Sequence, residues 1–128
     1  MARLPQAAAA AFNRARTVTY EAGEALEAYQ AVAIDAGAAV AAGDGDHALG
    51  VVAKDADAGD NVTVAVDGAV PAFVADAVVA GEQLGSSAEA GELAAGDGHF
   101  TALTDAGDAA GLSHGGDFGA GIAMVNIH

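Results

Sequence analysis

The sequence contains no cysteine and no tryptophan in its 128 residues. Without thiols the chain can form neither a disulfide framework nor a thiolate metal site, so any zinc site would depend on histidine and carboxylate ligands. The sequence also lacks an unbroken run of about 20 apolar residues and the three-part pattern of a signal peptide. We therefore expect no contact with a membrane and no export by the usual route.

Positive charge is scarce, because four Lys and Arg residues stand against 18 Asp and Glu residues and the formal net charge is −14. Binding to nucleic acid needs a basic patch, and beyond residue 16 the only Lys or Arg is Lys54. This excludes nucleic acid as a partner. An acidic, lysine-poor surface suits molar salt, where the Debye length falls to about 3 Å. The composition predicts a halophilic source, and an acidic mesophilic protein is the alternative.

Large apolar side chains are few, because 37 of the residues in the 53% hydrophobic fraction are alanine. Burial of a Val or Leu side chain contributes about 1.5–3 kcal/mol, whereas ordering one residue of backbone costs about 1–2 kcal/mol. The length fits one domain, but a core this thin leaves a lone monomer marginal. We therefore expect an oligomer or a surface on which the protein sits.

Charge divides the chain into a basic arm, residues 1–16, and an acidic body, residues 17–128. Arg3, Arg14 and Arg16 all precede the first acidic residue, Glu21. A short basic segment of this kind is either a loose terminus or a docking element for a partner.

The body shows the pattern of short strands, which are rich in valine or alternate in polarity between Gly and Asp residues. The expected strands are 17–20, 29–34, 48–53, 61–66, 69–74 and 121–127. We expect a mainly β fold, a small compact β-barrel of short strands with an extended N-terminal arm. Closure into a barrel would remove the exposed edges of an all-β chain.

The Asp67-Gly68 pair allows two interpretations. The pair can form the tight turn of a hairpin over 61–74, or Gly68 can form a bulge in one bent strand. Pro71 cannot donate a hydrogen bond to a neighbouring strand, so we expect it at an edge or an irregular point.

The motif Ala-Ala-Gly-Asp-Gly occurs twice, at 41–45 and at 94–98. Each copy follows a short apolar run. The repetition indicates two similar halves, although such turns also recur by chance in this composition.

Acidic and histidine residues are the candidates for a metal site. A helix-loop-helix calcium loop needs oxygen ligands at its positions 1, 3 and 5 and glutamate at position 12, and neither acidic run fits that spacing. Solvated turns are the preferred interpretation, and the weak candidates for metal binding are Asp44, Asp46, Asp55, Asp57 and Asp60. The four histidines, His47, His99, His114 and His128, are not spaced as a pair on one strand or helix face.

Patterns typical of catalysis are lacking. Ser113 and His114 are adjacent, so their side chains would diverge on an extended chain, and no Gly-x-Ser-x-Gly motif occurs. The stretch GDGDHALG does not have dinucleotide-binding spacing, and no phosphate-binding loop is present. We expect no enzymatic activity and no cofactor.

The order of three segments carries a family resemblance. These are RTVTYEAGEAL, then AVAIDAGAAVAAGDGDHALGVVAKDADAGDNVTVAVDGAVPAFVA, and finally AGIAMVNI at the end of a glycine-rich second half. Over residues 16–127 this order resembles the small capsid decoration (head cement) proteins of tailed viruses. The second half is longer and more acidic than is usual in that family.

The resemblance implies a structural virion protein, often a trimer, that stabilises the icosahedral capsid from its outer surface by binding the major capsid protein. Together with the acidic composition it points to a virus of a halophilic archaeon. We expect the arm to bind the capsid through Arg3, Leu4, Phe12, Arg14 and Arg16. The alternative is a small halophilic β-barrel that recognises a carbohydrate or carries a cofactor on Lys54.

Overall fold

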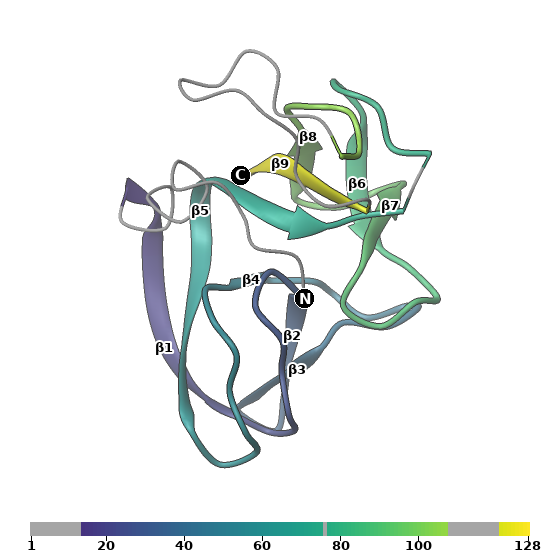
Figure 1. Ribbon diagram of the computed structural model, residues 1–128. Helices are drawn as coiled ribbons and strands as arrows, with labels where there is room; N and C mark the ends of the chain where they lie inside the picture. The colour runs from purple at the N-terminus through teal and green to yellow at the C-terminus, as the bar shows by residue number, and fades with distance from the viewer. Residues whose placement is uncertain (1–13, 76, 108–120) are drawn as a thin grey trace.

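The computed structural model describes residues 14–75, 77–107 and 121–128. Within these residues the chain forms nine β-strands joined by turns (Figure 1). The strands are Arg16–Ala22 (β1), Ala31–Asp35 (β2), Ala38–Ala41 (β3), Gly50–Val52 (β4), Asn61–Phe73 (β5), Gln83–Ser86 (β6), Leu93–Ala95 (β7), Phe100–Ala102 (β8) and Ile122–Ile127 (β9). The prediction of a mainly β fold is confirmed.

The strands hydrogen-bond in the order β1-β3-β2-β4-β5-β9-β8-β6-β7. An additional pairing of β1 with β5 closes the first five strands into a ring. The remaining strands continue from β5 and curl back, so that Val74 forms a parallel bridge with Leu93. The compact β fold is therefore not one simple barrel, because its single sheet curls around two interiors.

The long strand β5 connects the two curled halves (Figure 1). Its first part pairs with β1 and β4, and from Gly68 onward it pairs with β9. The bend lies at Gly68, whose φ of 111° favours glycine, and the register against β1 shifts between Arg16 and Thr17. The hairpin interpretation of 61–74 is wrong and the bulged-strand interpretation is right. Pro71 lies in the part of β5 that pairs with β9 alone, as a residue without an amide proton requires.

The two halves of the sheet repeat one another strand by strand. In the first repeat, β1 pairs antiparallel with the first part of β5. In the second repeat, the second part of β5 pairs antiparallel with β9 in the same way. β2 pairs with β3 and β4, and β6 pairs with β7 and β8 in the same way. The parallel pairing of Ala22 with Ala39 recurs as the bridge of Val74 with Leu93. The chain therefore consists of a first repeat, residues 16–67, and a second repeat, residues 68–127, that have one topology.

The repetition extends to the turns and the core. The repeated Ala-Ala-Gly-Asp-Gly motif starts within β3 in one repeat and within β7 in the other. One buried cluster fills the ring of the first repeat and comprises Ala22, Leu26, Val32, Ala39, Val52, Val62 and Val64. The equivalent residues of the second repeat all belong to the larger buried cluster and are Val74, Val78, Leu84, Leu93, Ala102, Ala123 and Val125. The indication of two similar halves is thus supported by pairing and by core positions alike.

Candidate functional site

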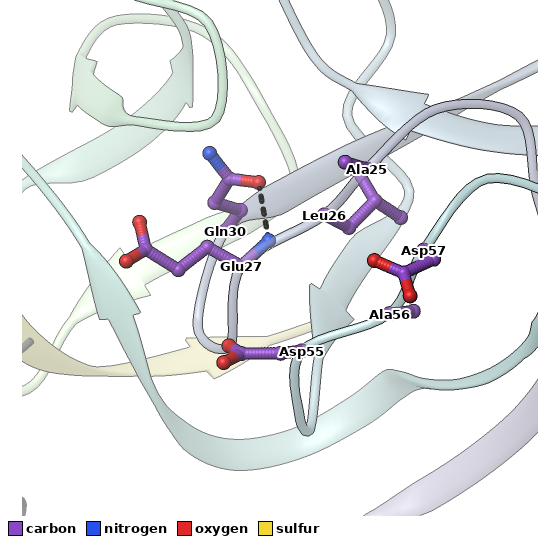
Figure 2. A pocket seen from close by; sticks show the side chains of 7 residues that line it. All are labelled: Ala25, Leu26, Glu27, Gln30, Asp55, Ala56 and Asp57. Carbon is purple, nitrogen blue, oxygen red and sulfur yellow. Dashed lines mark hydrogen bonds between the residues drawn. The ribbon is translucent and has the colours of Figure 1, made fainter.

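A hollow of about 330 Å³ opens on the first repeat between two loop segments (Figure 2). One segment joins β1 to β2 and the other joins β4 to β5. Leu26 and Ala56 tie them together by exchanging backbone hydrogen bonds of 2.8 and 2.9 Å. Leu26 is buried in the core of this repeat, which fixes the floor of the hollow. Its lining residues are Ala25, Leu26, Glu27, Gln30, Asp55, Ala56 and Asp57.

Polar side chains around this hollow hold the backbone of the loops. The Ala28 amide donates to Asp55 Oδ1 at 2.8 Å. The Glu27 amide donates to Gln30 Oε1 at 2.9 Å, the bond drawn as a dashed line in Figure 2. Such contacts satisfy turn amides that would otherwise lack a partner. The carboxylates left facing the hollow can accept hydrogen bonds from a ligand, but the lining contains no hydroxyl or thiol nucleophile and no histidine.

Tyr29 lies next to this hollow in an unusual backbone conformation. Its φ is 75°, in the left-handed region that bulky residues rarely adopt, whereas the equivalent position of the second repeat is Gly81 with a φ of 94°. Burial raises the pKa of the Tyr29 phenol, and the negative charge of Asp55 raises it further. A second hollow of about 140 Å³ adjoins the same loop. It is lined by Glu27, Gln30, Phe73, Ala90, Gly91 and Glu92.

The acidic residues singled out in the sequence lie in loops between strands, and two of them bond within their own turn. Asp46 Oδ2 accepts from the Gly43 amide at 2.8 Å, and Asp60 Oδ2 accepts from the Asp57 amide at 3.2 Å. Asp55 and Asp57 share the first hollow, whereas Asp46 lies beside a different one next to His47. The described part of the chain contains no group of three or more His, Asp or Glu side chains placed to hold a metal ion. Whether any of these carboxylates binds a cation stays a prediction.

The histidines are placed in a way that the sequence did not indicate. The rings of His47 and His99 meet edge to face with their centroids 4.7 Å apart. His128 follows β9 next to His99, and His114 lies outside the described residues. In the sequence a histidine closely follows each copy of the repeated Ala-Ala-Gly-Asp-Gly motif, which marks the two positions as similar but does not show that they meet.

The basic arm can be described only at its end. Arg3, Leu4 and Phe12 lie outside the described residues, and Arg14 and Arg16 are exposed. Arg16 is the first residue of β1 and pairs with Asp67 of β5. Among the residues that the structure describes, no helix has the length and apolar character needed to cross a membrane.

Comparison with known proteins yields matches in structure only. No family model and no curated protein matches the sequence. The base of the head fiber gp8.5 of bacteriophage phi29 matches with a TM-score of 0.63 and 18% identity, over 88% of this chain and 93% of that one. A C-terminal fragment of the phi29 gene product 12 matches with a TM-score of 0.63 and 13% identity, over 86% and 98% of the two chains.

The pre-mature form of the same gene product 12 also matches, with a TM-score of 0.66 and 13% identity. That match covers 89% of this chain but only 21% of the longer phage protein. At these identities the likeness establishes the fold. The chain has the fold of these phi29 phage proteins.

Proposed function

We propose that this chain is a structural protein of a virus particle. The observation that carries the proposal is the match to the phi29 head fiber base, which extends over nearly the whole of both chains. A second match to a phi29 fragment of similar size supports it. The order of the sequence segments, which resembles capsid decoration proteins, leads to the same class of protein by a separate route.

The partner in this proposal is the major capsid protein, bound from the outer surface of the capsid. The body of the chain carries all 18 acidic residues, so a contact through the body alone would face an acidic shell of the same host with like charge. Arg3, Arg14 and Arg16 can instead form bidentate hydrogen bonds with carboxylates of the shell. Leu4 and Phe12 supply apolar anchors for the arm.

The chain is proposed to assemble as a trimer. Its buried side chains are mostly alanine and valine, so each protomer has a modest core of its own. Large apolar side chains remain partly exposed on both repeats, namely Val18, Ile34, Val79 and Leu103. Contacts between copies would cover part of this surface.

Co-sedimentation with purified capsids tests the capsid-binding role. The full chain is expected to sediment with the particles. A chain that lacks residues 1–14 keeps Ala15 against the core and Arg16 in β1, so it is expected to fold but to stay in the supernatant. Replacement of Arg3, Arg14 and Arg16 by glutamine is the matched variant, because it removes the charge and keeps the length. A full chain that does not sediment contradicts the proposal, and a truncated chain that sediments equally well shows that the arm is not the docking element.

A binding or carrier module is the second candidate, favoured by the hollows beside Tyr29 and by the exposure of Lys54 just after β4. A carrier would hold its group covalently on Lys54. Intact-mass measurement of the protein from its native source tests this candidate. An adduct that maps to Lys54 would favour it, and the unmodified mass would exclude a covalent carrier.

A further inference from the structure

Two histidines from equivalent places in the two repeats meet on the surface. His47 lies in the turn between β3 and β4, and His99 lies in the turn between β7 and β8. Their ring centroids are 4.7 Å apart with an angle of 72° between the ring planes. Both residues are exposed, so an ion from solution can reach the rings. The contact joins the first repeat to the second.

The backbone on each side of this pair is held in place by strand β6. Ser86 Oγ donates to the carbonyl oxygen of Asp46 at 2.7 Å, which fixes the turn that carries His47. On the other side, a Cβ at Gly98 would overlap the carbonyl oxygen of Leu84, so glycine alone lets the turn before His99 lie directly on β6. The two histidines therefore approach one another from supported positions.

A third histidine, His128, follows β9 and contacts His99 through its backbone. The His128 amide donates to the carbonyl oxygen of His99 at 2.8 Å, which extends the pairing of β8 with β9 by one residue. The His128 ring forms a 2.8 Å hydrogen bond between Nε2 and Thr101 Oγ1. His128 is therefore joined to His99 through the backbone, while its ring is bonded to Thr101, so the ring contact consists of His47 and His99.

We propose that His47 and His99 bind one divalent transition-metal ion of the zinc, nickel or copper type. Imidazole nitrogen is a preferred ligand of these ions, whereas magnesium and calcium prefer oxygen. The protein supplies two ligands here, so water completes the coordination sphere and the site stays open. Because one ligand comes from each repeat, the ion would clamp the two halves of the sheet together.

Calorimetric titration of the full chain with Zn²⁺ tests the proposal, with excess Mg²⁺ present to occupy the carboxylates. We expect one Zn²⁺ ion per chain, with affinity reduced on the order of tenfold or more in His47→Gln and in His99→Gln. His114→Gln is the control for a general effect of removing one imidazole, and it is expected to bind Zn²⁺ like the original chain. His128→Gln is a second control and is expected to bind Zn²⁺ like the original chain, because the His128 ring is bonded to Thr101.

A second readout is the melting temperature, because an ion that binds only the folded chain stabilises it. Zn²⁺ is expected to raise the melting temperature of the original chain and of His114→Gln, but not of the His47→Gln/His99→Gln double variant. Circular dichroism without metal verifies that the variants fold. Zn²⁺ binding that survives in the double variant, or no Zn²⁺ binding by the original chain, would overturn the proposal. This test is independent of the proposed role in a virion.

Discussion

Two residues other than glycine have a positive φ among those described, and they have different explanations. Ala36 has a φ of 51° and is followed by Gly37 with a φ of 85°, so the two form the tight turn between β2 and β3. This turn type matches the twist of a hairpin but favours Asn-Gly over Ala-Gly. Tyr29, with a φ of 75°, is the third residue of the turn 27–30, in which the Gln30 amide donates to the Glu27 carbonyl oxygen at 3.2 Å. This turn position favours glycine, so a tyrosine is uncommon there.

Replacement of Ala36 by asparagine is expected to stabilise the protein. Alanine in the left-handed region is disfavoured by about 1–2 kcal/mol, and asparagine tolerates this region better. We expect the free energy of unfolding to rise by about 0.5–1 kcal/mol, measured by chemical denaturation. Ala58→Asn is the control, because Ala58 is also exposed in a turn but has no positive φ. A gain of the same size in both variants would show that the conformation at Ala36 is not the cause.

The raised pKa of Tyr29 predicts a loss of stability in alkali. In the unfolded chain a tyrosine ionises near pH 10, whereas the folded chain needs a higher pH because burial and Asp55 disfavour the charged phenol. Between these two pKa values the unfolded chain binds fewer protons, so the free energy of unfolding falls as the pH rises. Below about pH 10 the contribution is fully present.

Unfolding measured from neutral to strongly alkaline pH tests this expectation. Tyr29→Phe should lose less stability above about pH 10 than the original chain does, and Tyr20→Phe is the control that removes the other phenol. If Tyr29→Phe has the same alkaline slope as the original chain, ionisation of Tyr29 does not contribute to it.

Among the glycines of the first repeat, Gly50 has the least space for a side chain. A Cβ at this position would overlap the carbonyl oxygen of Ala65 and would lie 2.9 Å from Val64 Cγ1. We expect Gly50→Ala to lower the free energy of unfolding by roughly 3 kcal/mol or more, since backbone cannot move away as a side chain can. Gly43→Ala is the control, because its Cβ would lie 3.6 Å from the nearest atom, Asp46 Oδ2. Equal free energies of unfolding for the two variants would show that β4 can move away from β5 and make room for the methyl group without loss of stability.

At the scale of the strands, the sequence predicted those with valine or isoleucine in an alternating or continuous run. Five observed strands, β1, β2, β4, β5 and β9, overlap the expected ranges. The strands that were not predicted, β3, β6, β7 and β8, have three or four residues and consist largely of alanine, glycine and polar side chains. Their local pattern carries little preference for a strand, so they are fixed by pairing with neighbours rather than by their own side chains.

The candidate site was predictable only in part for a similar reason. Asp55 and Asp57 were singled out because acidic residues cluster there in the sequence. Glu27 and Gln30 were not, because they join the hollow only when Leu26 pairs with Ala56 across the sheet. The His47–His99 contact likewise depends on how the two repeats curl against each other, which no spacing along the chain shows.

At the scale of the whole molecule, the net charge of −14 predicts a dependence on salt. When salt falls from 1 M to 0.1 M, the Debye length grows from about 3 Å to about 10 Å, so repulsion between carboxylates reaches further. We expect the melting temperature and the assembled mass to fall over this range, measured by calorimetry and light scattering. Sodium chloride and potassium chloride serve as matched salts. An unchanged melting temperature and mass from 1 M to 0.1 M salt would remove the argument for a halophilic source.

The whole molecule is a small β unit of two similar repeats, and it shares its fold with phi29 phage proteins. The proposed role in a virion depends on contact area, and the acidic loop residues Asp46, Asp55 and Asp60 hold backbone amides of the loops. The central claim is therefore that the protein is located on the virus particle.

Antibody labelling of gradient-purified virus particles, read by electron microscopy and by quantitative mass spectrometry of the same fractions, tests that claim most directly. The account predicts that the protein co-purifies with intact particles in many copies and that the label decorates the outside of the head. A protein that is abundant in infected cells but missing from purified particles would contradict the account.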